Sequence, residues 1–319
     1  MMVAPVALNA EFTYTTNNGT ITITGHIGAG GAIAIPDTIA GLPVTSIGYH
    51  AFYEYTSLTS VAIPNSVTSI GGGGFGGCTS LTSVAIPNSV TSIGGGAFGG
   101  CTSLTSVAIP NSVTNIGAGA FDQCTSLASA TIPDGVTSIW NCTFSFCTNL
   151  ASVTIGHSVT YIDFYAFSSC SSLTTVTVPA SVTYIARLAM NGCTSLTGIF
   201  FEGNVPGPGI DDPFGFDCIA TVYYLPGTTG WGPTFGGLPT ALWNPLLHAD
   251  GPGLGVQPDG FRLEVTGTTN IPVVVEACVD LSNMVWVPLQ TNKLTGGCLD
   301  FLDSPWTNHP ARFYRVRSP

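Results

Sequence analysis

Apolar side chains recur along most of the chain at a fixed spacing of 23 residues. The clearest landmark is an Ile-Pro pair. The pair begins at Ile63, Ile86, Ile109 and Ile132. Weaker forms of it follow at Ile155, Val178 and Phe201. A fixed period of about 20 to 50 residues is typical of a solenoid, in which each unit stacks only on its neighbours. The spacing therefore predicts a stack of 23-residue coils.

Four apolar columns run through these repeats. The first holds Val67, Val90, Val113, Val136, Val159 and Val182, and the second holds Ile70, Ile93, Ile116, Ile139, Ile162 and Ile185. The third holds Phe52, Phe75, Phe98, Phe121, Phe144 and Phe167 and ends with Met190, and the fourth holds Leu58, Leu81, Leu104, Leu127, Leu150, Leu173 and Leu196. A single coil is too short to bury these side chains alone, so we expect each column to form a ladder inside one continuous core.

Each repeat also contains a short alternating segment. Val84 and Ile86 are predicted to point inward, and Ser83 and Ala85 outward, as in a short parallel strand. The proline that follows cannot donate a ladder hydrogen bond and is expected to end the strand.

The repeat IPxSVTxIGxxAFxxCxSLxxV resembles the BspA-type leucine-rich repeat family of bacterial surface and secreted proteins. The resemblance covers roughly residues 35–202, with seven copies. It implies a right-handed, curved solenoid, a role in adhesion or protein binding, and an extracellular or cell-surface location. It does not imply catalysis.

The predicted fold class is mainly β: a leucine-rich-repeat solenoid with a parallel strand ladder, followed by a small antiparallel β-sandwich. Residues 1–34 are expected to form an N-terminal hairpin cap, because Asn17-Asn18-Gly19 separates two alternating runs. Residues 35–243 are assigned to the solenoid and its C-terminal cap coil, 244–258 to a Pro/Gly linker, and 259–319 to a sandwich of about five to seven strands. Val222 lies 23 residues after Ile199 and predicts one further ladder strand.

Composition narrows the possible partners. Only 7% of the residues are charged, and six basic residues against 17 acidic ones give a net charge of −11. Without a basic stripe, the chain lacks the electrostatic basis for nucleic-acid or acidic-membrane binding. It has no run of 18 apolar residues that would predict a membrane span. Met1–Ala10 ends like a signal-peptidase site but lacks a basic start, so it is either a truncated signal peptide or a tail without meaning.

Ten cysteines raise the question of disulfides and metals. Six lie on the repeat period, namely Cys78, Cys101, Cys124, Cys147, Cys170 and Cys193. We expect them to form a ladder of small buried apolar side chains about 4.8 Å apart. No convergent zinc spacing exists. The pairs Cys142–Cys147 and Cys278–Cys298 remain possible disulfides in an exported protein.

No catalytic, cofactor-binding or metal-binding group is expected, and the chain is not predicted to be an enzyme. None of the five histidines lies in a recognisable triad motif. No Gly-Lys-Ser/Thr follows the glycine runs, so they do not indicate phosphate binding. Asp211, Asp212 and Asp217 could hold a calcium ion, but they lack an EF-hand pattern, and a solvated loop is favoured.

The candidate ligand-binding residues are mostly small. One outward column of the strand ladder holds Ser60, Ser83, Ser106, Ser129, Ser152 and Thr175, and a second holds Ala62, Ala85, Ala108, Thr131, Thr154 and Thr177. These columns either form a protein-binding surface or result from recent duplication of the repeat, with no ligand yet selected. Trp140, Tyr161 and Tyr165 replace small residues in later repeats and are candidate hot spots.

These patterns and the family resemblance together favour a non-catalytic exported repeat protein that mediates protein–protein binding or cell-surface adhesion. Its partner would be an extracellular protein or a cell-surface ligand. The alternative is binding of an ordered surface, such as polysaccharide or ice, by the flat Ser/Thr ladder. Alanine at three of the six positions in the second column weakens that alternative. The sequence does not indicate an oligomeric state.

Overall fold

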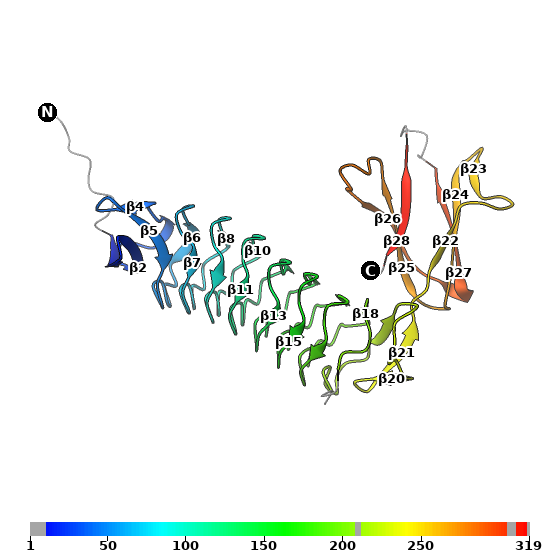
Figure 1. Cartoon of the computed structure of the whole chain (residues 1–319), viewed down its shortest axis with the longest axis horizontal. Helices are drawn as coiled ribbons and strands as arrows, with labels where there is room; N and C mark the ends of the chain where they lie inside the picture. The colour runs from blue at the N-terminus through cyan, green and yellow to red at the C-terminus, as the bar shows by residue number, and fades with distance from the viewer. Residues whose placement is uncertain (1–10, 208–211, 305–310, 318–319) are drawn as a thin grey trace.

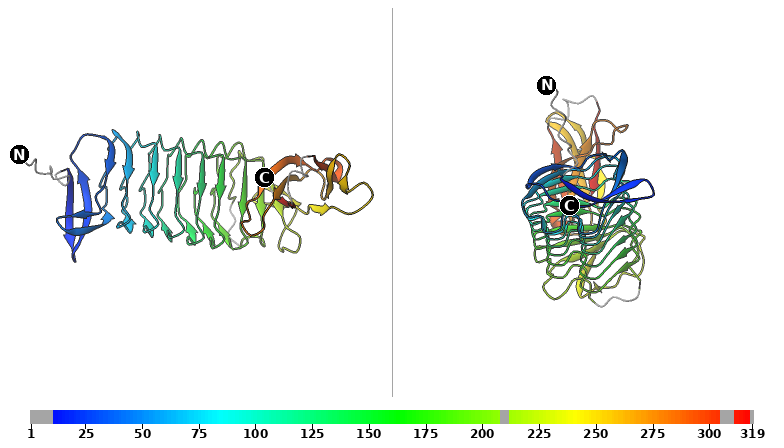
Figure 2. Two further views of the ribbon diagram at one scale, coloured as in Figure 1. Left: turned by 90° about the horizontal axis from the view of Figure 1, so that it is seen from above. Right: turned by 90° about the vertical axis from the view of Figure 1, so that its left-hand side faces the viewer.

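The computed structural model describes residues 11–207, 212–304 and 311–317. It shows a long stack of coils with two antiparallel sheets rising from its C-terminal end (Figure 1). Seen from above, the coils follow one another along a single axis, and the N-terminal hairpin lies at the far end (Figure 2). The described residues contain no α-helix and one short 3-10 turn, Thr295–Gly297. The predicted mainly β fold is confirmed.

A row of parallel strands, the main ladder, runs the length of the stack, and its strand pairing divides it into three sheets. Its strands are β3 (Gly31–Ala34), β6 (Leu58–Ala62), β8 (Ser83–Ala85), β10 (Ser106–Ala108), β12 (Ser129–Thr131), β14 (Ser152–Thr154), β16 (Thr175–Val178), β18 (Gly198–Phe201), β19 (Thr221–Tyr224) and β21 (Leu238–Leu242). From β6 to β19, paired residues are 23 positions apart, as Val61 and Val84 are. The offset is 28 residues between Ile33 of β3 and Val61, and 18 residues between Val222 of β19 and Thr240. The strand predicted around Val222 is β19, and β21 extends the ladder by one more strand. The two-residue β20 (Thr234–Phe235) forms a hairpin with β21.

A second ladder of shorter strands runs beside the main one. It comprises β5 (Leu42–Ile47), β7 (Ser69–Ile70), β9 (Ser92–Ile93), β11 (Asn115–Ile116), β13 (Ser138–Ile139), β15 (Tyr161–Ile162) and β17 (Tyr184–Ile185). Its N-terminal end is covered by the predicted hairpin of β1 (Phe12–Asn17) and β2 (Thr20–His26). Asn18 and Gly19 both have positive φ, as a tight two-residue hairpin turn requires. The extra residues of the first repeat form β4 (Thr38–Ile39), which turns back onto β5.

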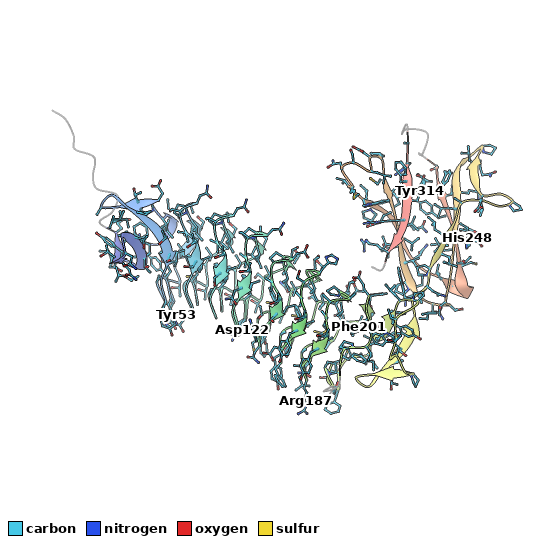
Figure 3. The ribbon with its side chains drawn as sticks, in the orientation of Figure 1. Tyr53, Asp122, Arg187, Phe201, His248 and Tyr314 are labelled. Atoms are coloured by element: carbon cyan, nitrogen blue, oxygen red, sulfur yellow. The ribbon has the colours of Figure 1, made fainter. Side chains whose placement is uncertain are left out.

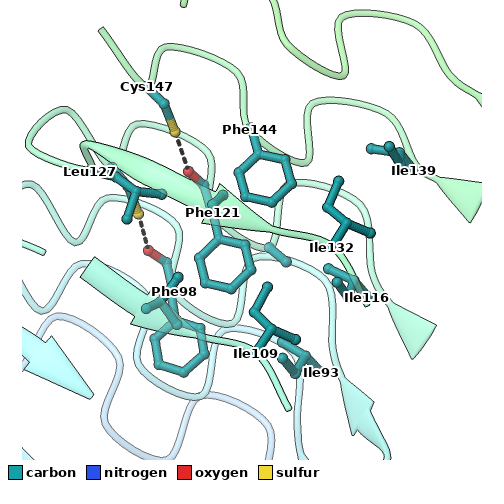
Figure 4. Packing of buried hydrophobic residues seen from close by; sticks show 14 of the residues in the cluster. Ile93, Phe98, Ile109, Ile116, Phe121, Leu127, Ile132, Ile139, Phe144 and Cys147 are labelled. Atoms are coloured by element: carbon teal, nitrogen blue, oxygen red, sulfur yellow. Dashed lines mark hydrogen bonds between the residues drawn. The ribbon is translucent and has the colours of Figure 1, made fainter. Parts of the chain in front are cut away.

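The four apolar columns form the predicted continuous core, which the phenylalanines show most clearly. Successive rings from Phe52 to Phe167 are 5.0 to 5.6 Å apart between centroids and within 2° to 11° of parallel. Figure 4 shows three of them, Phe98, Phe121 and Phe144. Each of these rings is buried. The alternation predicted for the strands is also confirmed, because Val84 and Ile86 are buried while Ser83 and Ala85 are exposed.

The six periodic cysteines lie in a buried file, as predicted. Each thiol donates to the carbonyl oxygen of the phenylalanine 26 positions earlier, at 3.1 to 3.2 Å. Figure 4 shows this contact from Cys147 to Phe121. Burial raises the pKa of Cys78 and of Cys147 to about 12, so these thiols are neutral hydrogen-bond donors at physiological pH. Cys147 lies in the core whereas Cys142 lies on a partly exposed turn, and the two are not joined.

The two C-terminal sheets form the predicted antiparallel sandwich. One sheet contains β22 (Leu246–His248), β23 (Gly255–Gln257), β24 (Gly260–Thr266) and β27 (Cys298–Asp303), and the other contains β25 (Pro272–Cys278), β26 (Val287–Lys293) and β28 (Phe313–Arg317). The prediction that residues 244–258 form a linker is wrong in detail. This segment contains β22 and β23, which both pair with β24. These strands are only three residues long and lie among Pro and Gly, so they leave no alternating pattern.

The possible Cys278–Cys298 disulfide is wrong. Both cysteines are free in the structure. Cys298 pairs with Thr266, the last residue of β24, which leads through a short turn into the start of β25. Cys278 is the last residue of β25 and lies at the opposite end of that strand. Six residue steps of about 3.3 Å put the two ends of β25 roughly 20 Å apart, far beyond the reach of a disulfide.

The sandwich is packed onto the end of the solenoid. Phe200 and Tyr223 occupy outward positions of the main ladder, in register with Thr177. Their rings stack at 4.8 Å and share a buried cluster with residues of the sandwich. Trp243 lies edge-on to Phe200, and its indole N–H donates to the carbonyl of Pro272 at 2.9 Å. The sandwich therefore stands as a wall at the C-terminal end of the main ladder, on its outward side (Figure 1).

We expect Phe98→Ala to lower the free energy of unfolding by about 3–5 kcal/mol, because it opens a cavity in the middle of the phenylalanine file. Ser83→Ala, on the exposed side of a neighbouring coil, should be nearly neutral. Urea denaturation followed by circular dichroism measures both. Equal losses of stability in the two variants would contradict the inward and outward assignment.

Candidate functional site

The first outward column of the main ladder is a straight, shallow row of hydroxyl groups. It holds the predicted residues Ser60, Ser83, Ser106, Ser129, Ser152 and Thr175, all exposed or partly exposed. Register pairs such as Ser60–Ser83 and Ser129–Ser152 align them from coil to coil. With alanine and threonine in the adjacent outward column, this surface, the ladder face, is flat and nearly uncharged.

The three predicted aromatic residues lie on a different side. Tyr161 points outward from the second ladder, 6.1 Å from the Trp140 ring and stacked at 5.0 Å on Tyr184. Tyr165 follows in a turn, in a left-handed backbone conformation (φ 55°). These turns lie away from the sandwich, as Figure 3 shows for Tyr53 and Arg187, which lie in the corresponding turns of other coils. The structure therefore divides the nine predicted residues between two surfaces.

A cleft that the sequence did not predict lies where the ladder face meets the sandwich. Its outer chamber has a volume of about 640 Å³. The floor consists of outward residues of β14 and β16, and the wall is the exposed face of β28. The chamber is lined chiefly by Ser152, Thr154, Thr175, Thr177, His157, Glu202, Arg315 and Arg317.

A smaller inner chamber of about 210 Å³ continues the cleft toward the sandwich. Thr177, Glu202 and Arg317 line both chambers, which therefore lie next to each other. The remaining lining is largely apolar and aromatic: Phe200, Phe201, Tyr223, Tyr224, Leu225, Trp243 and Val316. We call the two chambers together the corner cleft. The sequence did contain one signal for it, since Phe200 and Tyr223 replace the small outward residues of earlier coils.

An ion-pair network organises the wall of the corner cleft. Glu276 is 3% exposed and lies on β25 beside Arg315 of β28. Arg315 donates through two nitrogens to one carboxylate oxygen of Glu276, at 2.8 and 2.7 Å, and Arg317 donates to the other oxygen. The Arg315 guanidinium also lies 4.4 Å above the Trp286 ring, a cation–π geometry.

These contacts set the ionisation of Glu276. Burial acts to raise its pKa, but hydrogen bonds and charge from Arg317 and Arg315 outweigh burial and hold the pKa below its usual value. Two guanidinium groups and one carboxylate give the wall a net charge of about +1 at neutral pH. This local positive charge is unusual in a chain with a net charge of −11.

Other sequence candidates do not gather into a site. Asp211 lies outside the described residues, as does the Met1–Ala10 segment. Asp212 accepts hydrogen bonds from the backbone N–H groups of Phe214 and Gly215, so its carboxylate closes a turn. Within residues 11–207, 212–304 and 311–317, no group of three or more His, Cys, Asp or Glu side chains is placed to hold a metal ion. In the same ranges no helix is long and apolar enough to cross a membrane.

A family model described as a BspA-type leucine-rich repeat region matches residues 45–145 and 116–207. Among solved structures, a leucine-rich cell surface protein of Faecalibacterium prausnitzii is 32% identical over 68% of this chain and 69% of its own, with a TM-score of 0.57. A leucine-rich repeat protein of T. pallidum is 31% identical over 51% of this chain and 87% of its own, with a TM-score of 0.44. No curated protein sequence matches the chain.

We expect Glu276→Gln to lower the free energy of unfolding at pH 7 by about 1–3 kcal/mol, because a buried amide replaces the shared carboxylate. The loss should fall short of that for a fully buried pair, since Arg315 and Arg317 are 47% and 44% exposed and can be hydrated. Glu264→Gln, on the other sheet, is the matched control.

The loss of stability caused by Glu276→Gln should become smaller as the pH falls. Because the pKa of Glu276 is lowered by folding, its stabilisation is present above the unfolded-state pKa and is lost as the pH falls through the folded-state pKa. Urea titrations at pH 7 and pH 3 should therefore show a smaller difference between wild type and Glu276→Gln at the lower pH. A difference that stays constant or grows would contradict the assignment.

Proposed function

Because the chain belongs to the BspA-type leucine-rich repeat family, we propose that it is a non-catalytic, exported repeat protein that binds another protein outside the cell or at the cell surface. The observation that carries this proposal is the ladder face. It is an open, ordered surface built from many coils, with no charged side chain in either outward column.

The ladder face has the dimensions of a protein-binding surface. From Ser60 to Thr175 it spans five coil steps, or about 24 Å at 4.8 Å per step. Small side chains allow a partner to approach the backbone closely, so affinity would come from shape and hydrogen bonds rather than from net charge. The sandwich closes one end of the face and gives a bound partner a second surface to contact.

The proposed location and adhesive role rest on similarity. The F. prausnitzii protein is described as a cell surface protein, and this chain shares its repeat architecture. Binding at a surface is also consistent with a core that holds the ladder face rigid, so that little conformational order is lost on association.

A second candidate function, binding of an ordered surface such as polysaccharide or ice, is favoured by one observation: outward residues recur in register from coil to coil. The hydroxyl pattern is interrupted, however, by Ala62, Ala85 and Ala108. On the second ladder, Tyr161 and Tyr184 stack on each other, so they present ring edges rather than a flat platform. Inhibition of ice recrystallisation, or retention on insoluble polysaccharide, would favour this candidate.

The proposal predicts that Ser106→Arg weakens partner binding by at least about tenfold, since a long cation on the flat face blocks close approach. Ser92→Arg introduces the same side chain on the second ladder and should leave binding unchanged. The intact chain is immobilised, extracellular-matrix and cell-wall protein fractions are passed over it, and the captured protein is then titrated against both variants. Equal affinity for Ser106→Arg and wild type would contradict the proposed surface.

A further inference from the structure

We propose that the corner cleft is a docking site for an extended peptide segment of the partner protein. The segment places one large apolar side chain in the inner chamber and a carboxylate against Arg315 in the outer chamber. This inference rests on the proposed function, because it assumes that the chain binds another protein.

The inner chamber provides the apolar anchor point. Phe200, Tyr223 and Trp243 are among its lining residues, and the rings of Phe200 and Tyr223 are stacked on each other. Its volume of about 210 Å³ is roughly seven times the 30 Å³ that one water occupies in the liquid. Displacing water from an aromatic-lined chamber of this size favours a large apolar side chain. Space for one side chain, rather than for a folded element, indicates a peptide segment.

The outer chamber suits the backbone of that segment. Its floor holds four hydroxyl groups, on Ser152, Thr154, Thr175 and Thr177. Neighbouring coils set them about 4.8 Å apart across the ladder, and alternate residues set them about 6.6 Å apart along each strand. Hydroxyl groups both donate and accept, so this grid can meet the alternating N–H and C=O groups of an extended chain. Volumes of roughly 300–1,000 Å³ are usual for ligand sites, and the chamber of about 640 Å³ lies within that range.

The arginine side chains of the β28 wall favour an acidic residue in the bound segment. Arg315 and Arg317 are the cationic side chains among the residues that line the cleft, apart from His157 when it is protonated. Arg315 is already held in place by its hydrogen bonds to Glu276 and by the face of the Trp286 ring, so less side-chain order is lost on binding. Guanidinium groups match carboxylates in geometry as well as in charge.

The charges that line the cleft also determine how far the acidic residue of the segment lies from its apolar residue. Glu202 lines both chambers and therefore lies near their junction. A second carboxylate close to the apolar anchor would meet this negative charge. Arg315, by contrast, lines only the outer chamber. The acidic residue of the partner is therefore expected on one side of the apolar residue, separated from it by a short spacer.

The test uses a random heptapeptide phage library selected on the intact chain, followed by affinity measurements on synthetic consensus peptides. Thr177→Trp fills the junction of the two chambers with a ring in line with Phe200 and Tyr223. The matched control is Ser92→Trp, which places the same side chain on β9 of the second ladder, away from the ladder face and the cleft. Melting curves of both variants establish that they are folded.

The proposal predicts peptides that combine a large apolar residue with an Asp or Glu. Their affinity should fall at least about tenfold for Thr177→Trp and change less than about twofold for Ser92→Trp. Replacing the peptide's acid by its amide should weaken binding to wild type but should have little effect on binding to Arg315→Gln. No enrichment, a basic consensus, or equal affinity for both tryptophan variants would overturn the proposal.

The outcome is separable from that of the proposed function. If peptides fail to bind while Ser106→Arg still weakens binding of the captured partner, the proposed role of the ladder face is supported and only the proposed role of the corner cleft is rejected. If peptides bind as expected but Ser106→Arg has no effect, the cleft stands and the wider ladder face is rejected.

Discussion

Hydrogen bonding along the solenoid axis is the interaction on which the rest of the structure depends. In each coil, backbone N–H groups donate to the neighbouring coil, as Gly94 does to Ile70 at 2.8 Å and Phe98 does to Ala120 at 2.8 Å. Side chains reinforce this pattern, because the Thr91 hydroxyl donates to the carbonyl of the preceding coil. A coil separated from its neighbours would leave these groups unpaired and its apolar columns in water, so no coil is stable alone.

Such stacking must be ended, because an open ladder presents unpaired strand edges. At the N-terminal end, the β1–β2 hairpin covers the second ladder. At the C-terminal end, the last ladder strand, β21, pairs with β20 in a hairpin. Beside this end, Phe200 and Tyr223 break the run of small outward residues, and the sandwich packs over them. That packing also creates the corner cleft, since it joins a hydroxyl-rich floor, an aromatic inner chamber and a wall of paired charges. The segment with the weakest repeat pattern therefore forms the most distinctive surface.

The sequence predicted those parts of the structure that repeat. A shift of one residue would turn Val84 from the core to solvent, so the columns define both the strands and their register. Non-local features were not predictable in the same way. The Glu276–Arg315 pair joins residues 39 positions apart through the pairing of β25 with β28. The aromatic lining at Phe200 and Tyr223 was visible in the sequence, but its role depends on where the sandwich docks.

The central claim is that the coils are interchangeable units held in register by their period, and coil deletion tests it most directly. Deleting residues 86–108 removes one whole 23-residue coil and joins Ala85 to Ile109, so every column is preserved. Deleting residues 86–97 removes a half coil and puts the columns out of register. In urea titrations followed by circular dichroism, the whole-coil deletion should give a cooperative transition close to that of wild type, and the half-coil deletion should lose most of its stability. Equal behaviour of the two deletions would contradict the account.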